Sequence, residues 1–366
     1  MSLFSKEKRL DARITNLHTP HPIFEFDGKQ LPVNQSLDIP SAVRYILDHI
    51  RLTDVHAVGH RVVHGADLYT KTTKITDKVI KGLTNLSELA PLHNQACLEG
   101  IHAAKAYFGP SCDHFAVFDT AFHSSMPEKA FRYALPQDIT EKFGIRRYGF
   151  HGLSHAFLWD VYSKARGSEK KIISVHLGAG CSMAAVANGI SIDTSMGFTP
   201  CEGLIMATRS GDIDPCILAH LCKNAKISLD EATEMLNYKS GLLGISQSSS
   251  DMRALLKIYE TSKPAKLAID MFCYRAQKYI GAFLTALQGA DAIVFTGGIG
   301  ENAHEIRSLI LHPLEWLGIR LENILNCNLV QPTPHTLHVI SGPESAIEVA
   351  VVAADENYYI KNQIER

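Results

Sequence analysis

The stretch from Ile172 to Pro215 constrains the fold most, because it alternates short apolar runs with small-residue turns. Its first apolar, β-branched run ends in Gly178-Ala179-Gly180. Two further strand-like runs follow, joined by Asn188-Gly189. Asn-Gly between two apolar runs is a strong hairpin signal, because both turn residues must accept positive φ. The stretch therefore predicts strand, glycine turn, strand, two-residue hairpin turn and strand.

Small residues in the first turn leave backbone N–H groups free to meet an anion. Arg209 lies shortly downstream among small polar residues, and Arg61 ends another predicted strand. The rigid fork of an arginine suits a phosphoryl group better than the point charge of a lysine. A pair of buried salt bridges would fit the same spacing equally well. The layout indicates phosphate chemistry.

Length and composition describe an ordinary globular protein. With 366 residues the chain is long enough for two domains, each with its own core. A net charge of −2 argues against a nucleic-acid partner bound through its phosphates. The eight cysteines include no C-x-x-C pair, which disfavours a zinc ribbon or dithiol site. No apolar run approaches a signal core or membrane span, so we expect no membrane partner and a cytoplasmic location.

Predicted strands alternate with predicted helices along the chain. Val55 to Val58, His114 to Phe118 and Ala292 to Phe295 read as strands, and Pro264 opens a long helix to Leu287. Alternation of this kind predicts an α/β fold with a largely parallel core. We place the domain boundary in the arginine- and glycine-rich segment around residue 148.

Thr296 to Asn302 predicts a glycine turn between a strand and a helix. It imitates a dinucleotide fingerprint but does not open a domain, so a phosphate or nucleotide contact is favoured over a Rossmann site. Gly180 to Ala184 resembles a nucleophile elbow. An elbow must lead into a helix, whereas a strand is predicted here, so a hydrolase is disfavoured. There is no P-loop sequence.

His151 and His155 have the spacing of two zinc ligands on one helix face. Gly152 between them and the arginines before them disfavour a divalent cation. A structural role is the commoner one for such a pair, and hydrogen bonding to phosphoryl oxygens is the alternative. Asp119 ends the predicted strand and could be a cap, a base or a metal anchor. Taken alone, these residues predict a two-domain α/β phosphotransferase.

Seven motifs together closely resemble the acetate kinase family: GHRVVHG, APLHN, VFDTAFHSSMP, RRYGFHGLSH, DTSMGFTP, TRSGDIDP and FTGGIGEN. The resemblance implies an α/β fold with a duplicated actin-like (ribonuclease H-like) βββαβαβα core and an active site in the cleft between two domains. We expect residues 1–148 with 352–366 to form one domain and residues 149–351 the other. The resemblance also implies a homodimer that converts ATP and acetate reversibly to ADP and acetyl phosphate. The reaction would use Mg²⁺, with Mn²⁺ as an alternative.

The resemblance also assigns roles to matching residues. Arg61 and Arg209 would hold the carboxylate and the phosphoryl group, and Asp119 would support magnesium. His151 would stabilise the transferring phosphoryl group, supported by His93 and His155. The substrate's methyl end would contact Val63, Leu92, Phe150 and Pro200. Nucleotide-binding positions would be His176, Leu177, Gly178, Ala179, Gly180, Asp251, Met252, Arg253, Gly297, Gly298, Ile299, Gly300, Glu301 and Asn302. Glu356 would be the magnesium-associated glutamate.

The implied chemistry needs no protein nucleophile, because the carboxylate oxygen attacks the γ-phosphorus in line. The protein supplies positioning and charge neutralisation. We expect acetate to be preferred and propionate accepted. A propionate kinase is therefore the nearest alternative, and a nucleotide-binding homologue of low activity is another.

Three features depart from the family pattern: two single positions and one missing segment. Ala179 stands where the family has asparagine, and Glu356 is followed by Asn357 where the family has a second glutamate. The family's opening strand and its phosphate loop, N-x-G-S-S-S-x-K, have no counterpart here.

Because each lost oxyanion-type donor typically costs about 10²–10³ in rate, we expect slow turnover from the chain as it stands. Adding an upstream strand and an N-A-G-S-S-S loop should raise the rate at least about a hundredfold. Equal rates with and without the addition would show that the loop is dispensable.

Overall fold

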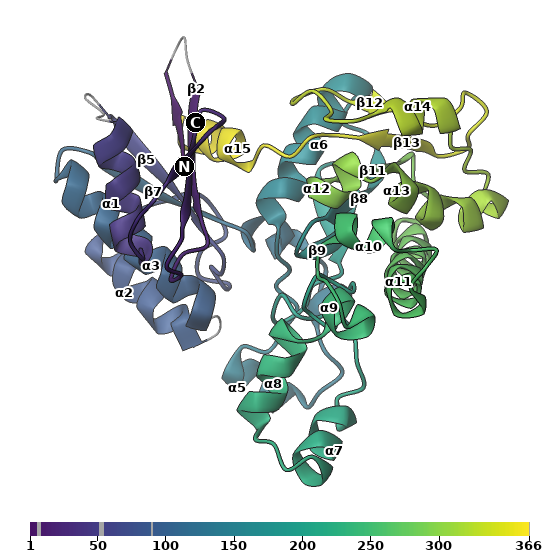
Figure 1. Ribbon diagram of the computed structural model, residues 1–366, viewed down its shortest axis with the longest axis horizontal. Helices are drawn as coiled ribbons and strands as arrows, with labels where there is room; N and C mark the ends of the chain where they lie inside the picture. Colours follow the sequence, from purple (N-terminus) through teal and green to yellow (C-terminus); the bar gives the residue numbers. More distant parts are fainter. Residues whose placement is uncertain (6–8, 51–54, 89–90, 366) are drawn as a thin grey trace. The chain divides into compact units, whose positions relative to one another are not determined.

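The computed structural model describes residues 1–5, 9–50, 55–88 and 91–365 (Figure 1). Its contacts divide the chain into two compact units. Unit 1 comprises Met1–Ala121 with Glu356–Arg366, and unit 2 comprises Phe122–Asp355. Residues 122–148, which we expected in the first domain, group with unit 2 through contacts such as Tyr148 N–H to the Gly197 carbonyl at 3.0 Å.

The strands of unit 1 form two sheets. One is a four-stranded antiparallel sheet of β1 (Ser2–Phe4), β2 (Arg9–Thr15), β3 (Ile23–Phe26) and β4 (Lys29–Pro32). In the other, β5 (Ala57–Val62) pairs in parallel with β7 (Asp113–Phe118), and β6 (Thr73–Lys74) pairs antiparallel with β7. Among the described strands, β1 and β5 are therefore edge strands.

The helices of unit 1 complete two apolar cores. They are α1 (Ile39–Ile50), α2 (Asp77–Asn85), the short 3₁₀ helix η1 (Leu86–Glu88), α3 (Pro91–Phe108) and α15 (Glu356–Ile364). Val62, Leu83 and Phe118 belong to a core shared by the β5–β7 sheet, α2 and α3. Phe24 and Ile46 belong to a second core, between the antiparallel sheet and α1.

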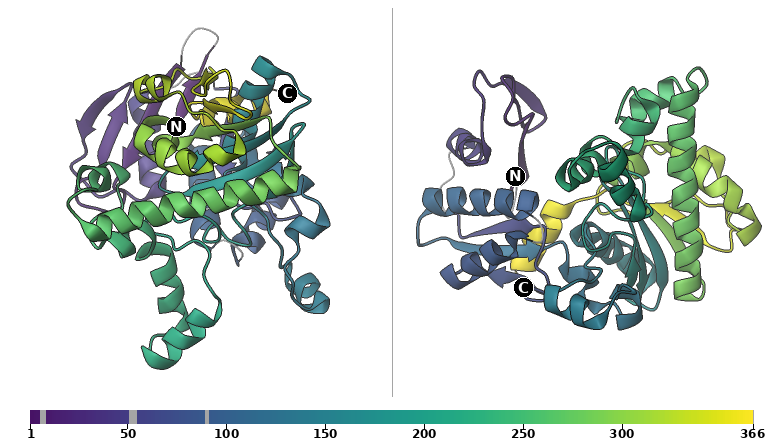
Figure 2. Two further views of the ribbon diagram at one scale, coloured as in Figure 1. Left: turned by 90° about the vertical axis from the view of Figure 1, so that its right-hand side faces the viewer. Right: turned by 90° about the horizontal axis from the view of Figure 1, so that it is seen from below.

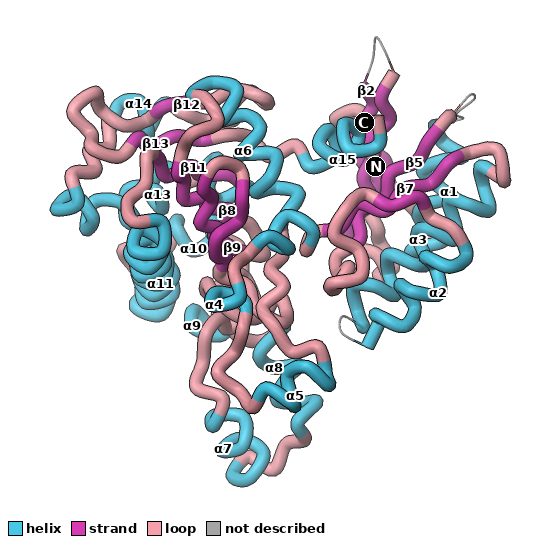
Figure 3. The backbone as a smooth tube through the Cα atoms, turned by 180° about the vertical axis from the view of Figure 1, so that it is seen from behind, coloured by secondary structure: helices cyan, strands magenta, loops and turns pink. Residues whose placement is uncertain are grey.

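Unit 2 contains a six-stranded mixed sheet in the order β10-β9-β8-β11-β13-β12. Its strands are β8 (Lys171–Leu177), β9 (Cys181–Ala187), β10 (Ile190–Thr194), β11 (Ala292–Thr296), β12 (His338–Val339) and β13 (Glu348–Val351). Strands β8, β11 and β13 are parallel and lie side by side in Figure 3. The predicted hairpin is confirmed, because β9 and β10 are antiparallel and Asn188 and Gly189 have φ values of 52° and 81°. The predicted α/β class with a parallel core is likewise found.

The helices of unit 2 follow and separate these strands. They are η2 (Ala121–Ser125), α4 (Glu128–Phe131), α5 (Gln137–Phe143), α6 (Gly152–Arg166), α7 (Cys216–Asn224), α8 (Leu229–Tyr238), α9 (Gly241–Ser246), α10 (Met252–Lys257), α11 (Lys263–Leu287), α12 (Gly297–Asn302), α13 (His304–Leu311), η3 (His312–Leu317) and α14 (Asn323–Asn328). Helix α11 packs against β8, β9 and β10 (Figure 2). It agrees with the predicted helix, and Pro264 lies in its first turn.

The prediction of a glycine turn at residues 296–302 is wrong, because residues 297–302 form helix α12. The Glu301 carboxylate accepts from the Gly297 N–H at 2.8 Å and satisfies a donor at the start of this helix. The guanidinium of Arg307, which is fully buried, donates to the carbonyls of Gly300 and Glu301 at 2.8 and 2.9 Å. Side-chain hydrogen bonds at both ends stabilise a helix that its glycines disfavour.

No helix in the described ranges is both long and apolar enough to span a lipid bilayer.

Two glycines provide a matched stability test. A Cβ at Gly189 would lie 2.7 Å from Nε1 of Trp159, and the residue has positive φ. Gly281, within α11, has no neighbour within 4 Å of an added Cβ. We expect Gly189→Ala to lower the free energy of unfolding by about 1–3 kcal/mol. Gly281→Ala should raise it by about 0.5–1 kcal/mol. Urea denaturation measures both, and equal effects would contradict the hairpin geometry.

Candidate functional site

The turn between β8 and β9 is the centre of the candidate site in unit 2. Gly178 to Gly180 join the two strands, and the Gly178 N–H donates to the Gly180 carbonyl at 3.1 Å. A Cβ atom on Gly180 would lie 3.2 Å from Nε2 of His151 and 3.5 Å from Nη1 of Arg209. A Cβ on Gly178 would lie 3.4 Å from Nε2 of His176. The structure thus brings two predicted imidazoles and a predicted guanidinium to the predicted glycine turn.

Arg209 is held at this turn by its own loop. The Ala207 N–H donates to the carbonyl of Ala179 at 3.0 Å, which fixes the loop to the turn. Nη1 of Arg209 donates to the Pro200 carbonyl at 3.3 Å and lies 3.7 Å from the Met206 sulfur. Among the described residues no carboxylate forms an ion pair with this half-buried guanidinium, so its charge is available to an anion at the turn.

His151 stands at the start of α6 in a left-handed conformation, with φ 55° and ψ 24°. Its Nδ1 lies 2.9 Å from the Ser182 hydroxyl of β9. Its ring centroid lies 4.5 Å from that of His176, whose Nδ1 is 2.8 Å from the Ser154 hydroxyl. Both imidazoles are therefore oriented through Nδ1, with the opposite ring edges at the glycine turn.

His155 lies one turn further along α6 and is fully buried. Its Nδ1 is 2.7 Å from the Ser174 hydroxyl and its Nε2 is 2.8 Å from that of Ser182. Burial lowers the pKa of His155 well below its ordinary value, and the nearby His123 and His176 lower it further. Both ring nitrogens of this predicted support residue are used inside the protein, so it acts behind the turn.

Ser174 and Ser182 were missed as site residues. His123, whose ring centroid lies 5.6 Å from that of His155, was missed as a buried neighbour of the site. The His123 Nε2–H donates to the Phe150 carbonyl at 3.1 Å, and its Nδ1 lies 2.8 Å from the Ser191 hydroxyl. Burial lowers the pKa of His123 to about 4. The motif VFDTAFHSSMP contained this histidine, but no spacing connects it with residue 191. Phe150, expected at the substrate's methyl end, is itself only 1% exposed.

In unit 1, Arg61 binds two carboxylates. It contacts Asp119 through Nε at 3.0 Å and Nη2 at 2.7 Å, and Glu356 through Nη1 at 3.1 Å. Asp119 raises the pKa of Arg61 above its usual value, although partial desolvation opposes this, and Glu356 adds to the rise. The Asp119 side chain is buried, whereas that of Arg61 is 40% exposed. Three predicted residues therefore form one cluster that presents a guanidinium to solvent.

The other predicted residues of unit 1 give less information. Val63 is half-buried just beyond the end of β5. Leu92 and His93 belong to the first turn of α3, and their side chains lie outside the described residues. Ala90, part of the same motif, lies outside them too.

The predicted nucleotide-binding residues that lie outside β8 and the glycine turn belong to two short helices of unit 2, α10 with its cap and α12. Asp251 caps α10 by accepting from the Arg253 N–H at 2.8 Å, and it also pairs with the Arg253 guanidinium at 2.6 Å. Met252 is buried. Glu301 accepts from the Ala354 N–H at 2.9 Å as well as from Gly297, so its carboxylate is occupied internally. Gly298 and Asn302 of α12 are exposed, Ile299 is partly exposed, and Leu177 and Gly300 are buried.

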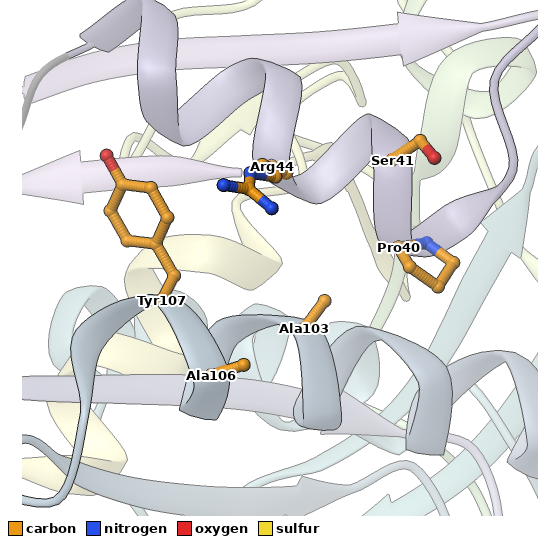
Figure 4. A pocket seen from close by; sticks show the side chains of 6 residues that line it. All are labelled: Pro40, Ser41, Arg44, Ala103, Ala106 and Tyr107. Atoms are coloured by element: carbon orange, nitrogen blue, oxygen red, sulfur yellow. The ribbon is translucent and has the colours of Figure 1, made fainter.

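Within the described ranges, no three histidine, cysteine, aspartate or glutamate side chains are grouped so that they could hold a metal ion. A separate hollow of about 430 Å³ lies on α1 and α3 of unit 1 (Figure 4). It is lined by Pro40, Ser41, Arg44, Ala103, Ala106 and Tyr107. None of the predicted site residues lines it.

Comparison with known proteins finds similarity over nearly the whole chain. The profile of the Acetokinase family matches residues 22–362. An acetate kinase of Chloroherpeton thalassium is 49% identical over 320 residues, covering 86% of this chain and 76% of that protein. The crystal structure of Porphyromonas gingivalis acetate kinase has a TM-score of 0.88 at 37% identity, covering 96% of this chain and 92% of that one. A propionate kinase from Francisella tularensis has a TM-score of 0.90 at 37% identity, covering 99% and 94%.

The buried, neutral state of His123 predicts acid sensitivity. Its pKa is about 4 when folded, against 6.5 ordinarily, so below pH 6.5 the unfolded chain binds a proton that the folded chain excludes. The free energy of unfolding should therefore fall as pH drops from about 6.5 to 4, by up to about 3 kcal/mol from this group. Urea denaturation at stepped pH should give a shallower dependence for His123→Gln. The same change at His220, which is exposed, should leave the dependence as in the wild type.

Proposed function

The chain belongs to the acetokinase family and has its two-domain actin-like fold, and on this premise we propose that it transfers the γ-phosphoryl group of ATP reversibly to acetate. The products are acetyl phosphate and ADP, so the enzyme is a phosphotransferase with a carboxyl acceptor. The single observation that carries the proposal is the meeting of His151 and Arg209 at the glycine turn. A guanidinium and an imidazole beside a turn of small residues suit a phosphoryl group in transfer.

For this reaction the protein must mainly position the reactants and neutralise the charge of the transferring group. Phosphoryl transfer spreads negative charge over the oxygens of the transferring group, with attacking and leaving oxygens roughly in line. We assign Arg209 and His151 to these oxygens, because both lie within 3.5 Å of the Cβ position that Gly180 leaves empty. His176 serves the same turn, and His155 supports His151 through Ser182.

Direct attack by the acetate oxygen fits the chemistry of the turn. Cys181 begins β9 immediately after the glycines, and its thiol donates to the Gly178 carbonyl at 3.3 Å. Burial raises the pKa of this thiol to about 12, so at neutral pH it is not a thiolate nucleophile. The protein's task is then to hold the reactants and neutralise charge.

In unit 1, we assign Arg61 to binding the acetate carboxylate and the phosphoryl group. Its planar fork can form paired hydrogen bonds to a carboxylate. Asp119 and Glu356 hold it from two directions, so its orientation is fixed before substrate arrives. Val63, Leu92, Phe150 and Pro200 remain our proposal for the methyl end, and His93 for a supporting role.

Mg²⁺ fits the donor set of the Arg61 cluster. This ion typically takes one or two protein carboxylates and completes its shell with water and substrate phosphates. Asp119 and Glu356 offer hard carboxylate oxygens on either side of one guanidinium. When bound with ATP, the ion would neutralise phosphate charge, and Mn²⁺ would serve as an alternative. The adenosine would contact residues 251–253 and the exposed face of α12.

We further propose a homodimer in the cytoplasm. Helix α11 exposes Leu267, Met271 and Tyr274, which are spaced along one helix face and suit contact with a second copy. All eight cysteines are free thiols, which fits a reducing compartment.

The two arginines test the proposed roles directly. Arg61→Ala and Arg209→Ala should each lower kcat for acetyl phosphate formation at least about a hundredfold, because each removes a charged donor to the transferring group. Arg44→Ala removes an exposed arginine of unit 1 outside the site and should keep near-native activity. Hydroxylamine trapping of acetyl phosphate measures the rate. Near-native rates in both variants, with folding intact, would overturn the assignment.

Substrate length separates acetate from the alternative acceptor propionate. A pocket that fits one methyl group rejects an extra methylene by only about 1–3 kcal/mol, so propionate should be accepted more weakly. We expect kcat/KM to fall from acetate to propionate to butyrate. A clear maximum at propionate would make the chain a propionate kinase, like the similar Francisella tularensis protein.

A further inference from the structure

Three buried side chains connect the interior of unit 2 to His151. Ser174 Oγ lies 2.7 Å from His155 Nδ1, His155 Nε2 lies 2.8 Å from Ser182 Oγ, and Ser182 Oγ lies 2.9 Å from His151 Nδ1. Ser174, His155 and Ser182 are all fully buried. We call this series, from Ser174 to His151, the serine–histidine chain.

The sheet register builds this chain. Ser182 of β9 pairs with His176 of β8, and Ser174 lies two residues before His176 on the same face of β8. His151 and His155 are separated by about one helical turn at the start of α6, so both rings reach that face. One hydroxyl of the sheet therefore contacts both imidazoles.

His155 is uncharged in this chain, because it is fully buried and, within the described part of the protein, its two ring nitrogens contact only serine hydroxyls. Burial lowers its pKa accordingly. A neutral imidazole has one N–H donor and one acceptor nitrogen. The position of that proton fixes which way every hydrogen bond in the chain points.

Only one direction satisfies every buried donor. If the Ser174 hydroxyl donates to His155, then His155 Nε2–H donates to Ser182, and Ser182 donates to His151 Nδ1. If the chain ran the opposite way, the Ser174 O–H would need another acceptor, and the described residues provide none. If both imidazoles donated to Ser182, its own O–H would have no acceptor among the residues that the structure describes. A buried hydroxyl without an acceptor is costly, so the first direction is favoured.

We propose that Ser182, oriented by His155 and Ser174, fixes His151 as the neutral tautomer that carries its proton on Nε2. This Nε2 lies at the glycine turn, so the tautomer presents an N–H donor there and not a lone pair that would repel an anionic oxygen. Ser182, His155 and Ser174 are positioning residues, acting on the phosphoryl group through His151. The effect of this tautomer on phosphoryl transfer rests on the proposed function, whereas the tautomer itself does not depend on it.

Nitrogen-15 NMR on the full chain, labelled at histidine, tests the tautomer without any turnover. Ring nitrogen shifts at neutral pH distinguish N–H from unprotonated nitrogen, and His151→Gln and His155→Gln assign the signals. We expect both histidines to carry the proton on Nε2 and none on Nδ1. A proton on Nδ1 of either ring would overturn the proposal. If the expected tautomers are found but acetate is not phosphorylated, the proposed function fails and this inference stands.

Variants of Ser182 test the consequence. Ser182→Ala removes the donor to His151 Nδ1, so the Nδ1–H tautomer of His151 should gain population. It should lower kcat at least about tenfold with KM for ATP within about twofold, because the lost effect is on one oxyanion-type donor. Ser182→Thr keeps the hydroxyl and should restore the wild-type tautomer and most of kcat.

Ser191→Ala is the matched control. It also deletes a fully buried hydroxyl 2.8 Å from a histidine, His123, but one outside the chain. Its kcat should stay within about twofold of wild type. Equal losses in Ser191→Ala and Ser182→Ala, or an unchanged tautomer and kcat in Ser182→Ala, would overturn the proposal. Should Ser182→Ala not fold, the wild-type tautomer measurement decides.

Discussion

Hydrogen bonds between imidazoles and serine hydroxyls support the glycine turn of unit 2. His151 and His155 each have a serine hydroxyl within 3 Å of a ring nitrogen. Buried side chains of this kind are stable only when every donor has an acceptor, so a satisfied network holds its members in one arrangement. The position of His151 at the turn follows from its contact with Ser182.

In unit 1, ion pairs hold a site residue in one orientation, as hydrogen bonds do in unit 2. Arg61 is held by Asp119 and Glu356, and Arg209 is held by the Pro200 carbonyl in unit 2. Groups that are already oriented need not reorganise when charge develops in a transition state, which is why such arrangements accelerate phosphoryl transfer. Unit 1 orients Arg61 with two carboxylates, whereas unit 2 orients Arg209 with a backbone carbonyl and His151 with a serine hydroxyl.

Local signals in the sequence predicted the elements well where a turn or cap residue was decisive. Asn188-Gly189 gave the hairpin and Pro264 the start of α11. The glycines at 297–300 misled, because the Glu301 carboxylate and buried Arg307 stabilise a helix there. The predicted candidates at the turn were brought together, with His155 behind them, but the serines that connect these histidines were missed. His155 and Ser182 are 27 residues apart, and only the packing of α6 on the sheet makes them neighbours.

In the function we propose, the protein positions the reactants and neutralises charge, while the acetate oxygen attacks phosphorus directly. Stereochemistry at phosphorus tests it most directly, using ATP made chiral at the γ-phosphorus with oxygen isotopes and acetate as acceptor. A single in-line transfer inverts the configuration in acetyl phosphate, and this is the result the structure leads us to expect. Retention would require two successive transfers through a phosphorylated enzyme and would contradict the account.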